Sequence, residues 1–234
     1  MSKNLSTFTF PAIILTALAA LYGAAAYNRN AVWRDPVSLW RDTVNKSPAK
    51  ARPHYNYAAS LIDAGRLEDA LRENLTALRI VPDSGRIHFN IGAIYHAWGR
   101  VDDAITEYRI AIALKNNLAE AHNNLAYAYY TKGYLDAALA EYNEALKHDP
   151  SHIKAYVNRG HVYQAMGRLQ DAAEDYKKAL MRNPAYAEAY WGLGQVFERT
   201  GRRQEAAAEY RNALTADPSF EKAEESLLGL YEKR

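Results

Sequence analysis

Apolar residues recur with helical spacing along most of this chain, and the pattern returns every 34 residues between positions 51 and 220. Five copies align without a gap. Glycine always occupies the fifteenth position of a copy, and alanine always occupies the twentieth and the twenty-seventh. The eighth position always holds a small residue: Ala58, Gly92, Ala126, Gly160 and Gly194. The pattern predicts a repeat protein with units at 51–84, 85–118, 119–152, 153–186 and 187–220.

Each unit contains two segments of about a dozen residues with apolar positions on one side. The glycine between them lies where a left-handed helix end is expected, and proline follows the second segment in four of the five units. Each unit is therefore predicted to be a helical hairpin. One hairpin cannot bury both of its faces, so neighbouring hairpins are expected to stack. Large aromatic side chains at the twenty-fourth position fill the space beside the small residues: Tyr108, Tyr142, Tyr176 and Tyr210.

These residues resemble the tetratricopeptide repeat over five units. The resemblance implies an all-α fold, a right-handed superhelical solenoid of helical hairpins. Three positions depart from the pattern, with Arg159 where leucine is usual, Asn74 where a large aromatic residue is usual, and Asn116 in place of proline. Two flanking segments complete the expected organisation: residues 28–50 as a junction with a degenerate half repeat, and residues 221–234 as a capping helix.

The N-terminal residues 1–27 form the most apolar part of the chain. Residues 7–27 carry no charge and match the roughly 20 residues needed to cross a hydrocarbon core, which predicts a single transmembrane helix before the solenoid. A cleaved signal peptide ending at Ala24–Ala26 is the alternative. The basic residues after this stretch favour cytoplasmic repeats by the positive-inside rule. The resemblance described below favours the opposite side, so the expected location is the inner (cell) membrane with periplasmic repeats.

Composition argues against several classes of function. The net charge is +2 with both signs mixed along the chain, so nucleic acid is not an expected partner. The absence of cysteine excludes thiolate chemistry, and no catalytic or nucleotide-binding motif is present, so neither an enzyme nor a cofactor is predicted. His54, His88 and His122 share the fourth position. Stacked repeats separate such residues by about 10 Å, whereas a metal ligand lies at ~2 Å, so no metal site is predicted.

The candidate binding residues share the sixth position of four successive units. Asparagine is a mediocre helix former, and a carboxamide offers one donor and one acceptor to an extended peptide. A similar column in the tetratricopeptide domain of O-linked N-acetylglucosamine transferase binds substrate main chain, which implies the same role here. The alternative is that these amides only join adjacent repeats. We call the following residues the asparagine column: Asn56, Asn90, Asn124 and Asn158. Aromatic residues that could form pockets beside it are Tyr55, Phe89, Tyr127 and Trp191.

The junction and the repeats are also similar to bacterial transmembrane tetratricopeptide proteins related to O-mannosyltransferases. The catalytic spans of such proteins have no counterpart in this sequence, so transferase activity is not implied. The predicted function is a membrane-anchored scaffold whose concave surface binds a protein or an extended peptide segment. Two alternatives remain, a substrate-recruiting subunit of a glycosyltransferase or secretion machinery, and a structural protein that assembles into homo-oligomers.

Overall fold

The computed structural model describes residues 22, 35–114 and 118–232, and within this part of the chain all regular structure is helical. The chain divides into two compact units, Met1–Pro82 and Asp83–Arg234. We call them the first and second units and describe each by itself. Asn116 lies outside the described residues.

The first unit contains three described helices, α2 (Pro36–Lys46), α3 (Ala51–Asp63) and α4 (Leu67–Ile80), in which α2 packs on α3 and α3 on α4. The start of α2 is well defined by its sequence. Asp35 accepts hydrogen bonds from the main-chain N–H groups of Val37 and Ser38, each at 3.1 Å, and proline occupies the first helical position. Proline is favoured there because its missing N–H would have no partner within the helix.

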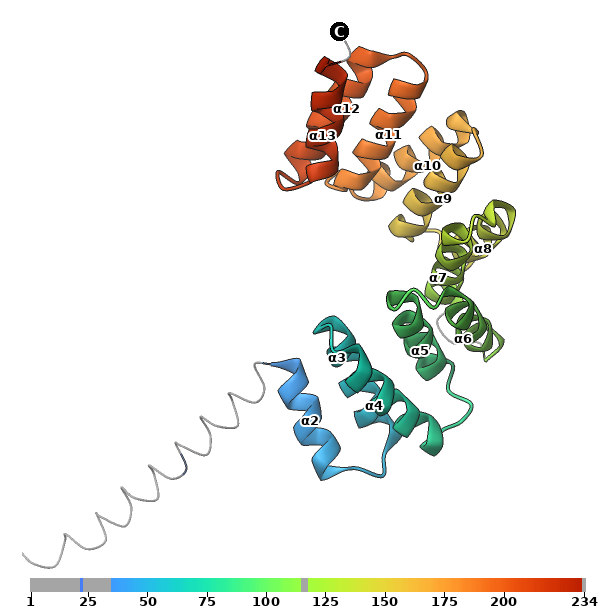
Figure 1. Cartoon of the computed structure of the whole chain (residues 1–234), viewed down its shortest axis with the longest axis vertical. Coiled ribbons are helices and arrows are strands. Elements are labelled where there is room, and N and C mark those ends of the chain that lie inside the picture. The colour runs from blue at the N-terminus through green and yellow to red at the C-terminus, as the bar shows by residue number, and fades with distance from the viewer. Residues whose placement is uncertain (1–21, 23–34, 115–117, 233–234) are drawn as a thin grey trace, which may run out of the picture. The chain divides into compact units, whose positions relative to one another are not determined.

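The described residues of the second unit form a succession of helices in which each one packs against the next (Figure 1). Four hairpins are followed by a final helix, which confirms the all-α stacked-hairpin prediction. The helices are α5 (Gly85–Ala97), α6 (Val101–Ala113), α7 (Leu118–Thr131), α8 (Leu135–His148), α9 (Ile153–Ala165), α10 (Leu169–Arg182), α11 (Ala187–Arg199), α12 (Arg203–Ala216) and α13 (Glu221–Glu232). We call α5, α7, α9 and α11 the first helices.

The glycine at the fifteenth position ends the first helix of every hairpin. All five of these glycines have a positive φ, between 71° and 78°, which a residue with a Cβ adopts only at a cost. At one representative turn, the N–H of Gly99 donates to the carbonyl of His96, and the N–H of Arg100 donates to that of Tyr95, both at 2.9 Å. These bonds satisfy the last carbonyls of the helix and reverse the chain.

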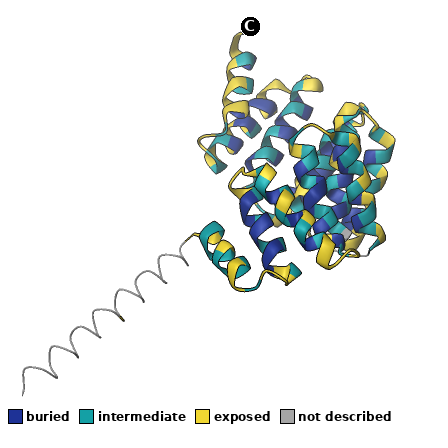
Figure 2. Cartoon of the chain, turned by 60° about the horizontal axis from the view of Figure 1, so that its bottom comes forward, coloured by how far each residue is buried: buried dark blue, intermediate teal, exposed yellow. Residues whose placement is uncertain are grey.

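The core is built from the small residues of one helix and the tyrosines of the next. The tyrosines at the twenty-fourth position are at most 2% exposed. A Cβ added at Gly160 would lie 2.6 Å from Cε1 of Tyr176, and one at Gly194 would lie 2.5 Å from Cε1 of Tyr210. The buried residues gather inside the stacked helices, with exposed residues at the turns and outer sides (Figure 2). Glycine is therefore needed at these crossings because the ring occupies the space of a side chain.

The predicted location in the inner membrane is wrong. In the described part of the chain no helix is long and apolar enough to cross a bilayer. The helices are 11 to 14 residues long, whereas a span requires about 20. The stretch 7–27, on which the prediction depended, lies outside the described residues except for Tyr22. Seven of its 21 residues are alanine and three are threonine, which contribute little apolar surface.

Candidate functional site

The asparagine column has three members in the second unit and one in the first. Asn90 is 7% exposed, and Asn124 and Asn158 are half-buried. Asn56 belongs to α3 of the first unit and is also half-buried. In the second unit, Asn90 is therefore buried, whereas Asn124 and Asn158 keep part of their surface exposed.

Hydrogen bonds join the column across adjacent hairpins. The amide Nδ2 of Asn158 donates to Oδ1 of Asn123 at 3.4 Å, and Nδ2 of Asn123 donates to Oδ1 of Asn124 at 3.1 Å. Burial raises the pKa of Tyr108 on α6, and Asn124 lowers it to a smaller degree. The amides therefore connect α7 and α9, as the stacking interpretation requires. Asn123 was missed from the sequence because asparagine occupies the fifth position in only one repeat.

The column ends at Gly192 for a steric reason. A Cβ at this position would lie 2.5 Å from Cζ of Tyr176, so the ring of the preceding hairpin fills the space of a side chain. The main-chain carbonyl of Gly192 accepts a hydrogen bond from the carboxamide of another residue, because Nε2 of Gln164 donates to it at 2.8 Å. Gln164 is only 8% exposed, so this bond is protected from water.

The predicted aromatic neighbours of the column differ in accessibility. Tyr127 is 43% exposed. Phe89 packs on Tyr108 with ring centroids 5.8 Å apart, and Trp191 donates from Nε1 to Oγ of Ser226 at 3.0 Å. Phe89 and Trp191 are thus largely engaged in packing, and Tyr127 is the open aromatic position among them. Tyr55 is half-buried on α3 of the first unit.

One side of the first helices lacks charged residues. Positions 5, 6, 9, 12 and 13 follow helical spacing and share this side, which we call the first-helix face. On α5, α7 and α9 none of its fifteen residues is Asp, Glu, Lys or Arg, although such residues make up 24% of the chain. On α11 the charged Glu198 and Arg199 appear. The fifteen uncharged residues are Phe89, Asn90, Ala93, His96, Ala97, Asn123, Asn124, Tyr127, Tyr130, Thr131, Val157, Asn158, His161, Gln164 and Ala165.

In the second unit, charged residues occupy the second position of each repeat and of the C-terminal segment that follows, and they alternate in sign. The contact with His152, whose Nε2 lies 3.4 Å from Oε2 of Glu120, and to a smaller degree the charge of Lys154 lower the pKa of Glu120. Glu188 has its pKa lowered by His161 first, then by Lys222 and Lys154. The basic residue of a neighbouring repeat therefore contributes to the lowered pKa of each carboxylate. In order along the second unit, the alternating residues are Arg86, Glu120, Lys154, Glu188 and Lys222.

The repeated histidines of the fourth position each contact a glutamate nineteen residues later, on the second helix of the same hairpin. The distances from Nδ1 to Oε2 are 2.5 Å for His54 and Glu73, 2.7 Å for His88 and Glu107, and 2.6 Å for His122 and Glu141. The side chains of the histidines are between 7% and 13% exposed. The recurrence of these histidines thus has a structural explanation, since each one joins the two helices of its hairpin.

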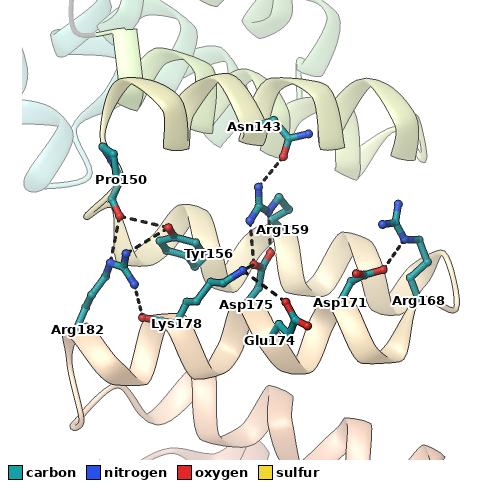
Figure 3. A network of polar contacts seen from close by, with 10 residues as sticks. All are labelled: Asn143, Pro150, Tyr156, Arg159, Arg168, Asp171, Glu174, Asp175, Lys178 and Arg182. Carbon is teal, nitrogen blue, oxygen red and sulfur yellow. Dashed lines mark hydrogen bonds and ion pairs between the residues drawn. The ribbon is translucent and has the colours of Figure 1, made fainter.

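The fourth repeat replaces that contact with a buried ion pair (Figure 3). Arg159 donates from Nε and Nη2 to the two carboxylate oxygens of Asp175 at 2.7 and 2.8 Å, and from Nη1 to Oδ1 of Asn143 at 2.5 Å. The side chain of Arg159 is 14% exposed and that of Asp175 is 2% exposed. The departure from leucine at this position therefore connects α8, α9 and α10. Sequence reasoning missed the partner because Asp175 replaces the glutamate of the other hairpins.

Two polar groups near Tyr127 were also missed. The ring of His96 lies 5.2 Å from that of Tyr127, and the Nε2 atom of His96 is buried without a hydrogen-bond partner among the described residues. Burial lowers the pKa of His96 below its usual value, so the imidazole is neutral at pH 7. The second group is the hydroxyl of Tyr142, which is likewise buried and without a partner in the described part of the chain. The sequence pattern predicts only a packing role for the tyrosines at the twenty-fourth position.

The lowered pKa of His96 predicts a pH dependence of stability. The unfolded chain binds a proton at this histidine near pH 6.5, whereas the folded chain resists doing so. Stability contributed by the neutral imidazole is therefore lost as the pH falls below about 6.5. We expect His96→Gln to reduce the fall in melting temperature between about pH 7 and 5.5, as measured by circular dichroism. An unchanged fall would show that His96 does not contribute to it.

Comparison with known proteins places the repeats in a defined family. The sequence pattern of the tetratricopeptide repeat matches residues 157–219, and a second pattern of the same repeat matches 92–133 and 127–167. The protein is similar to human protein O-mannosyl-transferase TMTC1, with 37% identity over 65 residues, and equally to the mouse protein. This match covers 28% of the chain but only 7% of the human protein, so it gives partial support to the resemblance to O-mannosyltransferase-related proteins.

Solved structures share the fold over most of the chain. The crystal structure of MamA has a TM-score of 0.61 and 26% identity, and the match covers 70% of this chain and 96% of MamA. TTC0263 from Thermus thermophilus has a TM-score of 0.65 and 22% identity, with coverages of 78% and 99%. YrrB, described as having an unusual peptide-binding site, has a TM-score of 0.61 and 18% identity, with coverages of 80% and 96%. Because the matched patterns together span more than half of the chain and the fold agrees, this protein belongs to the tetratricopeptide repeat family.

Proposed function

We propose that this protein is a scaffold that binds an extended, uncharged segment of a partner protein on the first-helix face of its second unit. The family fold suggests a protein–protein interaction scaffold and is generally non-catalytic. The observation that carries the proposal is the fifteen-residue uncharged face, along which the carboxamides of Asn124 and Asn158 are half-buried. Carboxamides pair with main-chain N–H and C=O groups of any sequence.

The bonds within the column do not exclude this role. Asn124 and Asn158 keep part of their surface exposed although they are bonded between repeats. A carbonyl oxygen has two lone pairs and an amide has two N–H groups, so each side chain has capacity beyond the bonds described. The same residues can therefore fix the stacking of hairpins and bind a peptide.

Site-specific crosslinking tests the proposal. A benzoylphenylalanine in place of Tyr127, which is 43% exposed on the first-helix face, should capture a discrete partner protein in cells. The matched control is the same replacement at Tyr134, which is 54% exposed at the start of α8 and away from that face, and we expect no capture there. Mass spectrometry of the crosslinked peptide should identify an uncharged stretch of the partner.

The double variant Asn124→Ala and Asn158→Ala separates binding from stacking. We expect capture through Tyr127 to fall at least fivefold, with the melting temperature measured in parallel. If capture is unchanged while the melting temperature drops, the column is structural and the proposal loses its mechanism. Capture of a second copy of this chain would instead support self-assembly.

A further inference from the structure

The helices α2 to α13 comprise five complete hairpins and two halves. In the register of the repeat, Trp40 of α2 occupies the twenty-fourth position, and Leu228 of α13 occupies the eighth. The helix α2 is therefore the second helix of a hairpin, and α13 is the first helix of another. Neither has the other half of its hairpin among the described residues. We call α2 and α13 the end helices.

Each end helix exposes the side that a complete hairpin buries. The four tyrosines at the twenty-fourth position are at most 2% exposed, whereas Trp40 is only half-buried and α2 contains no buried residue. The residue at the eighth position is buried in all five hairpins, whereas Leu228 is 56% exposed. Tyr231, one turn further along α13, is 44% exposed. Since α2 packs on α3 and α13 on α12, the exposed residues mark the opposite side of each end helix.

The complete hairpins show which positions of a first and a second helix meet. Position 8 meets position 24 wherever glycine lies beneath a tyrosine ring. Position 7 meets position 23 in the ion pair of Arg159 and Asp175. Position 4 meets position 30 where the rings of His122 and His148 stack with centroids 5.5 Å apart. These three pairs predict what would meet if α13 and α2 formed one hairpin.

The end helices are complementary at all three pairs. Two pairs are apolar, and the third joins opposite charges. The whole helices are also opposite in charge: α13 carries four glutamates and one lysine, a net charge of −3, and α2 carries one arginine and one lysine against one aspartate, a net charge of +1. Opposite charges favour encounter and fix the register of association. The pairs, with the residue of α13 first, are Leu228 and Trp40, Leu227 and Leu39, and Glu224 and Lys46.

The pair at positions 8 and 24 is larger than in the complete hairpins, where glycine or alanine occupies the eighth position. Within a hairpin a short turn holds the two helices close together, but no turn would connect helices of separate chains. Packed helices adopt axial distances of about 8–10 Å that depend on the side chains between them. The alanines of positions 20 and 27 are replaced in α2 by Pro36 and Thr43. Both ends therefore carry residues suited to a wider crossing.

We infer that α2 of one copy packs on α13 of a second copy, so that the protein associates head to tail through the hairpin that the two halves form. The contact is heterologous, because each copy uses a different surface at each of its two ends. The inference does not depend on the proposed function, since the first-helix face includes neither α2 nor α13.

Analytical ultracentrifugation of the full chain over a series of concentrations tests the association. We expect the average mass to rise with concentration, and Leu228→Glu to weaken association at least tenfold, because it would place an unpaired charge between apolar side chains. The matched control is Met181→Glu on α10, where the side chain is 82% exposed, and association should persist there. Circular dichroism should show the same melting temperature for both variants. A mass that stays at the monomer value, or equal effects of the two variants, would overturn the inference.

A charge swap tests the register of the contact. Lys46→Glu and Glu224→Lys each bring like charges together, and each should weaken association about fivefold. An equimolar mixture of the two variants should regain the affinity of the unmodified chain, because every contact between unlike chains again joins opposite charges. If the mixture associates no better than either variant alone, the inference is wrong.

Crosslinking identifies the surfaces directly, because the chain has no cysteine of its own. A mixture of Lys46→Cys and Glu224→Cys chains treated with a short bismaleimide should yield a crosslinked peptide that contains both positions, as measured by mass spectrometry. A mixture of Met181→Cys and Glu224→Cys chains should not. Absence of the first crosslink would show that another segment covers the end helices and would overturn the inference. Capture of a second copy through Tyr127 would instead count against the proposed function alone.

Discussion

Replacing Arg159 by leucine, the residue usual at this position of the repeat, should destabilise the second unit strongly. The substitution leaves the Asp175 carboxylate, which is 2% exposed, without its bidentate partner. Breaking a buried ion pair by removing one partner costs about 3–5 kcal/mol of the free energy of unfolding. Urea denaturation followed by circular dichroism measures this quantity.

The chain offers a matched control in the same hairpin. Arg168 and Asp171 form an ion pair at 2.7 Å in which both side chains are 45% exposed (Figure 3). Arg168→Leu should change the free energy of unfolding by at most about 1 kcal/mol. The double variant Arg159→Leu and Asp175→Leu should recover most of the loss, because it leaves no unpaired buried charge. Equal effects of the two single arginine variants would refute the structural role of the pair.

Gly160→Leu should destabilise the protein by overpacking. A Cβ at this position already lies 2.6 Å from Cε1 and 2.9 Å from Cζ of Tyr176, a ring that is completely buried and cannot move aside freely. We expect a loss of about 3 kcal/mol, the upper end of the range usual for overpacking. Thermal and urea unfolding of the variant would measure it.

A second glycine in the same chain provides the comparison. Gly229 lies within α13, and a Cβ there would meet no atom within 4 Å. Gly229→Ala should be neutral or stabilising by up to about 1 kcal/mol, because alanine has the higher helix propensity. Tyr176→Leu combined with Gly160→Leu should be less destabilised than Gly160→Leu alone. A loss of only a few tenths of a kcal/mol at Gly160 would contradict the repeat register.

The sequence predicted those features that depend on the 34-residue period. The glycines at the fifteenth position have the positive φ expected of helix ends, and the small residues at the eighth position meet the tyrosines of the twenty-fourth. The left-handed turn recurs in five repeats and the tyrosine beside the small residue in four. Repetition makes such requirements visible because no single copy is unusual on its own.

Features that occur once were not predictable in the same way. The partner of Arg159 is Asp175, an aspartate where the other hairpins carry glutamate. The pairing becomes apparent only in the structure, where three helices meet around Arg159. Tyr142 is the same residue type as Tyr176 and Tyr210, whose hydroxyls are hydrogen-bonded. Whether a tyrosine hydroxyl at this position is hydrogen-bonded depends on the side chains of the adjacent helices, and these side chains differ from repeat to repeat.

Because the charge at the second position alternates in sign, the charge pattern of the second unit repeats every two hairpins, whereas its packing repeats with every hairpin. Excision of the single repeat that carries Glu120 would bring Arg86 and Lys154 into neighbouring hairpins as like charges. Excision of the two repeats that carry Glu120 and Lys154 would leave Arg86 beside Glu188, which are opposite in sign. Deleting an odd number of repeats therefore places like charges in neighbouring hairpins, whereas deleting an even number keeps opposite charges there, although all the repeats have the same shape.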